Sequence, residues 1–151
     1  MFKYVTAIAF GLVLSHATLV GAGETRMLRP GLYEVAVKLE LPHLENTTAK
    51  RTATICVSDA DRNGSRGLAV LSENNPLARC PVSNVSESGD SLTFDIACEG
   101  GNAAVGSAKY VLGAESFEGR IAMKMGGKNM TMSETQVGRR IGECTSGAPR
   151  S

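Results

Sequence analysis

The sequence of 151 residues lacks an excess of charge of either sign, and this absence excludes one class of partner. It contains 16 Lys and Arg against 15 Asp and Glu, and Lys3 is the only charged residue among the first 22. Binding nucleic acid through bulk charge requires a clear positive excess. The pair Arg139-Arg140 is too short to form a basic patch. We therefore expect no nucleic acid partner.

Long hydrophobic runs are also missing, except for one at the beginning of the chain. A short positive start, "MFK", precedes the apolar run "YVTAIAFGLVL" and the small residues "VGAG". This order is typical of a secretory signal peptide, and the run is too short to span a membrane comfortably. We predict a signal peptide at residues 1–22 with cleavage after Ala22 and no transmembrane segment in the mature chain. The expected location is the periplasm or the exterior of the cell.

Closely spaced cysteine pairs, which zinc sites require, are absent as well. The cysteines are Cys56, Cys80, Cys98 and Cys144, all beyond the signal segment. An even number of widely spaced cysteines in an exported chain predicts disulfide bonds, here two of them.

Catalytic and calcium-binding residues are similarly scarce. His43 is the only histidine after residue 22, and no nucleophile or acid is close to it in a pattern that suggests a catalytic pair. The stretch "DADRNG" begins like a calcium loop at Asp59 and Asp61, but Val70 stands where the loop would need a bidentate glutamate. The sequence predicts neither a histidine-based active site nor a calcium site.

What the chain does contain is alternating β-type sequence with turn residues at short intervals. We predict an all-β fold: a single domain over residues 23–151, with a core at 28–144 and a flexible tail at 145–151. About seven strands would form an antiparallel meander that curls into a small barrel or half-barrel. One short helical segment is expected within residues 58–79, with Ser58 as a possible N-cap. The expected strands cover 31–41, 50–57, 80–87, 92–99, 107–112, 117–125 and a last strand from 130.

The hairpin around Gly89 predicts one disulfide. If the hairpin is symmetric about Gly89, Cys80 lies opposite Cys98 and Asn84 lies opposite Phe94. Opposed residues have Cα atoms about 4.5–5.5 Å apart, which a disulfide accepts. The pairing Cys56–Cys144 then follows by elimination, and it would join the second strand to the last.

The next two hairpins predict a shared inward face. Tyr110 should lie opposite Gly119, which an aromatic ring can cover. With Gly127-Lys128 as the turn, Met125 opposes Met130 and Met123 opposes Met132. The face formed in this way is our candidate ligand-binding site, and it comprises Phe117, Ile121, Met123, Met125, Met130, Met132, Glu134 and Gln136.

This face allows several interpretations. It could line an apolar ligand pocket, or it could be filled by the protein's own side chains. The four Met thioethers could bind Cu(I), which favours soft ligands, so copper is the alternative cofactor where we otherwise expect none. Glu134 and Gln136 require partners if they are buried, either in a polar interior or at an open strand edge. A one-residue slip in register would turn all of these side chains outward.

The motifs together resemble those of a known family. They are Pro30-Gly31-Leu32-Tyr33-Glu34, the four cysteines, the Met-rich hairpin and the closing Gly142-x-Cys144. The chain resembles, over about residues 28–144, the exported bacterial proteins catalogued as domain of unknown function 3617. Members often have Trp where Tyr33 stands, and this chain has no Trp. The resemblance implies a small periplasmic, mainly-β protein, and it brings no agreed activity or catalytic residues.

From these observations we expect a non-enzymatic periplasmic protein, a small binding or structural module. Its partner would be a small apolar ligand or an envelope protein, and it would be a monomer. Two further hypotheses remain open. One is an enzyme that uses Glu134 as an acid or base, and the other is an interaction module that pairs through an exposed edge strand.

Overall fold

The computed structural model describes residues 28–42, 49–61, 64–101, 103–127 and 130–145. The predicted signal peptide at 1–22, His43, Lys128 and nearly all of the predicted tail lie outside these residues. Seven β-strands and one short 3-10 helix are found. They are β1 (Gly31–Glu40), β2 (Ala49–Val57), η1 (Pro76–Arg79), β3 (Val82–Ser88), β4 (Ser91–Ala97), β5 (Val105–Leu112), β6 (Ser116–Met125) and β7 (Met130–Gly142). Within the described residues, no helix is long and apolar enough to cross a membrane.

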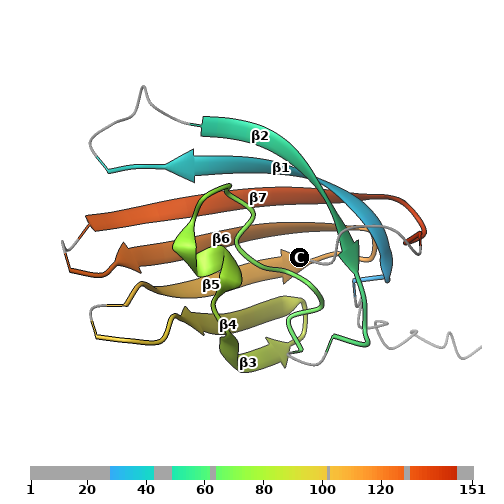
Figure 1. Ribbon diagram of the computed structural model, residues 1–151. Coiled ribbons are helices and arrows are strands. Elements are labelled where there is room, and N and C mark those ends of the chain that lie inside the picture. The colour runs from blue at the N-terminus through green and yellow to red at the C-terminus, as the bar shows by residue number, and fades with distance from the viewer. Residues whose placement is uncertain (1–27, 43–48, 62–63, 102, 128–129, 146–151) are drawn as a thin grey trace, which may run out of the picture.

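All seven strands form one antiparallel sheet in the order β2-β1-β7-β6-β5-β4-β3. The predicted all-β meander is therefore confirmed. Strand β1 joins it by pairing with β7 (Figure 1). The sheet does not close into a barrel, because β2 and β3 remain as its two edges. The expected barrel is thus an open sheet, which "half-barrel" describes only loosely.

One face of the sheet carries the core. The connection between β2 and β3, residues 58–81, runs across this face (Figure 1). Alternate residues of the strands point toward it, as the period of two requires. The largest fully buried side chains include four aromatic rings of the sheet and three leucines outside it: Tyr33, Phe94, Tyr110, Phe117, Leu28, Leu68 and Leu77. We call this covered side the inner face.

Within its described residues, the connection contains one short helical segment, as predicted, and this segment is a 3-10 helix. Its one helical turn is η1, which is capped by Asn75 through a hydrogen bond from the amide of Leu77. The prediction of Ser58 as an N-cap is wrong, because no helix begins at Ser58 in the described residues. The Ser58 hydroxyl instead accepts a hydrogen bond from the amide of Ala60, in a local turn.

The registers of the later hairpins agree with those predicted. Tyr110 pairs with Gly119, Met125 with Met130 and Met123 with Met132. A Cβ atom added to Gly119 would lie 2.1 Å from Cε1 of Tyr110, so the ring occupies the space that the glycine leaves. Gly127 has a φ of 77°, the sign that the first position of the predicted turn requires.

The hairpin of β3 and β4 differs from the prediction. Its turn is Gly89-Asp90, between the paired residues Ser88 and Ser91, and the register shifts at a bulge between Ser83 and Ser86. Asn84 lies in this bulge with a φ of 52°, so its predicted pairing with Phe94 is wrong. Beyond the bulge, Val82 pairs with Ile96, which is the register that a hairpin symmetric about Gly89 gives.

Both predicted disulfides are present. The Cα atoms are 4.8 Å apart in Cys80–Cys98 and 5.6 Å apart in Cys56–Cys144. Such bonds form and persist in oxidising compartments.

Candidate functional site

The four methionines of the β6–β7 hairpin share the inner face but differ in exposure. Met123 is 3% exposed, whereas Met130 is 48% exposed. Met125 and Met132 are half-buried and pack against the edge of the core. The hairpin thus runs from the core at Met123 to the solvent at Met130.

The deeper residues of the predicted site lie inside the core. Phe117 and Ile121 are both buried and belong to the main hydrophobic cluster. The ring of Phe117 packs against those of Tyr33 and Tyr110, with 5.8 Å between centroids in each pair. Phe117 and Ile121 therefore contribute chiefly to packing.

Glu134 is fully buried beside these apolar groups, and its hydrogen bonds explain how. One carboxylate oxygen accepts the backbone amide of Leu71 at 2.8 Å and the side-chain amide of Gln136 at 2.6 Å. The other accepts the amide of Ser72 at 2.9 Å and its hydroxyl at 2.5 Å. Buried charge is tolerated only with such partners. Glu134 therefore fixes the 58–81 connection to the middle of the sheet.

Gln136 extends the same network toward β5. Its side-chain NH₂ donates to the carbonyl of Ala69 at 2.7 Å, and its oxygen accepts the hydroxyl of Tyr110 at 3.0 Å. Burial, followed by the nearby charge of Glu134, raises the pKa of the Tyr110 hydroxyl. Tyr110 therefore remains a hydrogen-bond donor over the whole physiological pH range.

Asn75 connects this network to the methionines. Its side-chain NH₂ lies 3.2 Å from the hydroxyl oxygen of Ser72 and 3.2 Å from the sulfur of Met123. The partners of Glu134 and Gln136 thus belong to the loop that crosses the inner face. The alternative of an open strand edge is wrong, because β7 lies between β1 and β6. Ser72 and Asn75 were not predicted from the sequence. The available signal was that Glu134 and Gln136, if buried, need hydrogen-bond partners.

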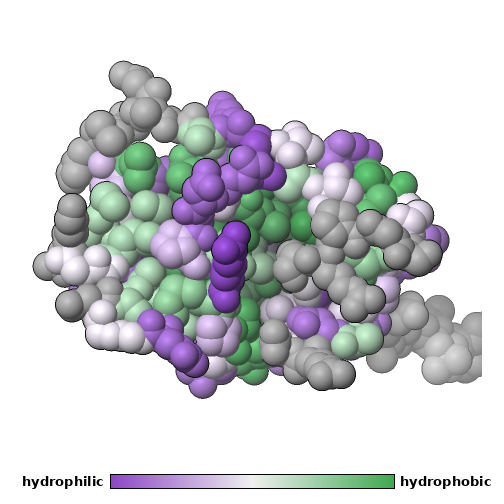
Figure 2. All heavy atoms as spheres, viewed as in Figure 1, coloured by the Kyte–Doolittle hydropathy of each residue, from purple (hydrophilic) through white to green (hydrophobic). Residues whose placement is uncertain are grey.

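Beyond this loop, the inner face remains partly uncovered at one end. Half-buried or exposed apolar side chains gather there around the end of the β6–β7 hairpin. We call this group the methionine patch: Leu39, Leu71, Met125, Met130 and Met132. Figure 2 shows apolar surface, in pale green, at the end of the sheet where this hairpin lies. The patch continues the core stripe of β6 and β7 out to the solvent.

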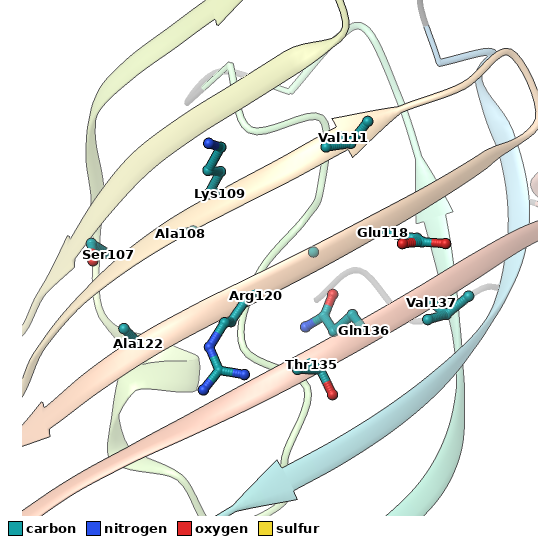
Figure 3. A pocket seen from close by; sticks show the side chains of 11 residues that line it. Ser107, Ala108, Lys109, Val111, Glu118, Arg120, Ala122, Thr135, Gln136 and Val137 are labelled. Atoms are coloured by element: carbon teal, nitrogen blue, oxygen red, sulfur yellow. The ribbon is translucent and has the colours of Figure 1, made fainter.

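The opposite, outer face of the sheet is not covered by any described segment. A groove of about 480 Å³ crosses it over β5, β6 and β7 (Figure 3). Its walls mix valines with charges of both signs: Lys109, Val111, Glu118, Arg120 and Val137. Arg120 is already held by Glu40 at 2.9 Å and by Ser133 at 2.6 Å. Because its walls are mixed in this way, the groove favours no particular class of ligand. An antiparallel sheet commonly exposes one face to water.

The residues that suggested a calcium loop have structural partners instead. Asp59 forms an ion pair with Arg66, whose guanidinium also binds Glu87 of β3 at 3.1 Å. Asp61 accepts hydrogen bonds from the hydroxyl of Ser65 at 2.8 Å and from the amide of Gly67 at 3.1 Å. Among the residues that the structure covers, no group of three or more His, Cys, Asp or Glu side chains could hold a metal ion.

Comparisons with known proteins identify a family but no characterised relative. The family model described as "Protein of unknown function (DUF3617)" matches residues 28–144. Neither a search of curated proteins nor a search of solved structures found a match. The matched segment contains all seven strands and ends at Cys144, which is bonded to Cys56. The chain therefore belongs to the DUF3617 family of proteins of unknown function.

Proposed function

We propose that this chain is an exported, non-enzymatic binding protein whose methionine patch holds an apolar ligand or an apolar segment of an envelope protein. The observation that carries the proposal is the change along β6 and β7. The same inner face is closed by residues 69–77 at Met123 and is open at Met130. Flexible thioether side chains can adapt to apolar partners of different shape.

Export is part of the same proposal. The signal-like segment at residues 1–22 and two disulfides support a periplasmic or secreted location. Within the covered part of the chain, each cysteine belongs to a disulfide. The disulfides hold β2, β7 and the base of β3 in place, and so the patch lies on a braced sheet.

The absence of an enzymatic role is supported by how Glu134 is used. Among the described residues, Glu134 is the one fully buried acid of the inner face, and it is the candidate acid or base. Both of its oxygens are occupied by hydrogen bonds from the chain itself. A role in catalysis would require breaking bonds that hold the crossing loop.

Binding of an apolar probe tests the proposal. The reporter would be N-phenyl-1-naphthylamine, whose fluorescence rises in apolar sites, displaced by laurate. We expect the double variant Met125→Glu/Met130→Glu to bind about tenfold more weakly, because a carboxylate is costly in an apolar contact. The control Val111→Glu/Val137→Glu adds the same charge to the outer face and should bind as the wild type does. Equal loss in both variants would refute the patch as the site.

The second candidate is Cu(I) binding, which the cross-strand pairs Met125–Met130 and Met123–Met132 favour. Replacing all four with Leu separates the two functions, because Leu retains apolar contact and removes the thioether. Apolar binding should persist in this variant. Cu(I) binding of the wild type and the variant is then compared by competition against a chromophoric chelator. Weaker Cu(I) binding by the variant would support copper, and equal binding would exclude it.

A further inference from the structure

The two edges of the sheet differ in how they are protected against pairing with another strand. Natural sheets protect edges with short strands, prolines, bulges and charged side chains, lysine above all. At β3, Pro81 precedes a strand of seven residues, and a bulge follows Ser83. Asn84 in this bulge has the left-handed φ of 52°, which interrupts a regular pairing surface.

At the other edge, β2 has no proline and no bulge, and its only protection of this kind is the charge of Lys50 and Arg51. Its nine residues pair one to one with β1, from Ala49 opposite Leu39 to Val57 opposite Gly31, without a shift in register. The strand contains no proline or glycine, and four of its residues are β-branched. Its pairing with β1 is therefore regular along the whole strand, although the strand itself is curved (Figure 1).

The backbone groups that β2 offers can be identified from the alternation of the ladder. Thr135 of β7 donates its hydroxyl to the carbonyl of Lys38, so the backbone of Lys38 faces β7 and turns away from β2. Lys38 pairs with Lys50. In an antiparallel ladder, Lys50, Thr52 and Thr54 then direct their N–H and C=O groups to the open side.

The far end of this edge is covered, which limits the free stretch. The amide of Ser58 donates to the carbonyl of Arg66 at 3.2 Å. A Cβ atom added to Gly67 would lie 2.9 Å from the carbonyl oxygen of Cys56. As far as the described residues show, the free edge therefore extends over residues 49–54.

The charge of this edge specifies the chemistry of a partner. The strand carries Lys50 and Arg51 and no acidic residue. Arg51 forms an ion pair with Glu73 at 2.6 Å, although its buried Nη1 lacks hydrogen-bond geometry. Lys50 is exposed and has no ion pair within the described part of the chain. A strand that docks here gains most when an acidic residue lies opposite Lys50.

We propose that β2 accepts an extended acidic segment of a partner protein as an additional antiparallel strand of the sheet. Backbone hydrogen bonds to Lys50, Thr52 and Thr54 would supply affinity, and the acid opposite Lys50 would supply selectivity. A second copy of the chain is a poorer occupant, because its β2 would add two more cations and no acid to the pairing. The proposal is independent of the methionine patch, which lies on the inner face.

Amide hydrogen exchange on the full mature chain tests this proposal. The probe is a capped peptide of alternating Thr and Val with one Glu placed to face Lys50, and its counterpart has Lys in place of Glu. In the free protein, the amides of Lys50, Thr52 and Thr54 should exchange fast and those of Arg51 and Ala53 slowly. The Glu peptide should slow the exchange of the first three. If it leaves them fast, the proposal fails.

Charge reversal tests the selectivity. In Lys50→Glu, affinity for the Glu peptide should fall about tenfold and the Lys peptide should become the better ligand. Lys124→Glu, which reverses an exposed charge on β6, should leave both affinities unchanged. Thr52→Pro removes an N–H group that faces the open side of β2 and leaves the hydrogen bonds to β1 intact, so it should abolish peptide binding. If this variant does not fold, the result with Lys50→Glu decides whether the proposal stands. Protection that appears with rising protein concentration and no peptide would assign the edge to a second copy and overturn the proposal.

Discussion

Glu134 accepts both the backbone amide and the hydroxyl of Ser72, so one carboxylate oxygen of the last strand fixes a residue 62 positions earlier in the chain. Loops that cross the face of a sheet need such anchors, because their backbone groups cannot join the ladder. The relationship makes Glu134 a structural acid, and it explains why an ionisable residue is retained in an apolar face.

Replacing this acid by its amide should therefore destabilise the fold. In Glu134→Gln, an NH₂ group would face at least one of the donors that the carboxylate now accepts. We expect a loss of about 1–3 kcal/mol in the free energy of unfolding, measured in urea. The amides of Leu71 and Ser72 should also exchange faster. Glu118→Gln on the outer face should change stability by less than about 0.5 kcal/mol, and a similar loss there would contradict this account.

The glycine beneath Phe117 should not tolerate a side chain. A Cβ atom added to Gly138 would lie 2.2 Å from Cε1 of Phe117, within a closely packed core. Gly138→Ala should cost about 1–3 kcal/mol in thermal or urea unfolding. Gly142→Ala, on the same strand with nothing within 4 Å, is the matched control. Adding Phe117→Leu to Gly138→Ala should cost less than the sum of the two changes, since the smaller side chain removes the clash.

The two disulfides should differ in their contribution to stability. They close loops with sequence separations of 88 and 18 residues. In the chain-entropy model these correspond to about 4.5 and about 3 kcal/mol. We expect Cys56→Ser/Cys144→Ser to unfold at a lower urea concentration than Cys80→Ser/Cys98→Ser. The reverse order would show that the effects on the folded state outweigh those on the unfolded chain.

Glu40 should contribute a pH-dependent part of the stability. Hydrogen bonds from Lys38 and then from Arg120 lower the pKa of the Glu40 carboxyl from 4.5 to about 2. A lowered pKa stabilises the folded state above the unfolded-state value, and this stabilisation disappears as the pH falls through the folded-state value. The melting temperature of Glu40→Gln should thus lie below that of the wild type at neutral pH, and the gap should close between about pH 4.5 and pH 2. A gap that persists below pH 2 would have another origin.

Oxidation by hydrogen peroxide should follow the exposure of the methionines. Met130, which is 48% exposed, should convert to the sulfoxide first, and Met123, which is 3% exposed, should convert last. Peptide mass spectrometry after brief treatment measures the order. In urea, where the fold is lost, the rates should become equal. Early oxidation of Met123 in the folded chain would mean that the hairpin opens at its base.

Local pairing could be predicted from the sequence because turns and cross-strand glycines determine it. Tyr110 opposite Gly119 and Met125 opposite Met130 follow from turn position alone. The disulfide Cys80–Cys98 was predicted correctly for a partly wrong reason. The tighter turn at Gly89 and the bulge at Asn84 shift the register in opposite directions, and the shifts cancel before the cysteines.

The crossing connection could not be predicted, because residues 58–81 have no periodic pattern and bond mainly to residues distant in sequence. Only Glu134 and Gln136, polar residues in an apolar stripe, indicated that something must cover them. Likewise, strand alternation specifies faces but not closure, so the sequence did not distinguish an open sheet from a barrel. Which two strands form the edges of the sheet could be identified only from the complete strand order.

The position of β1 between β2 and β7 has a consequence for the order of folding. The first strand pairs on one side with its neighbour in sequence, and on the other side with residues 133–142 at the far end of the chain. Until β7 is available, the β1–β2 hairpin and the β3–β6 meander have no strand to join them. Such distant pairing slows folding, because a long loop must close first. A chain that emerges from its first residue onward can therefore complete its sheet only after its last strand has appeared.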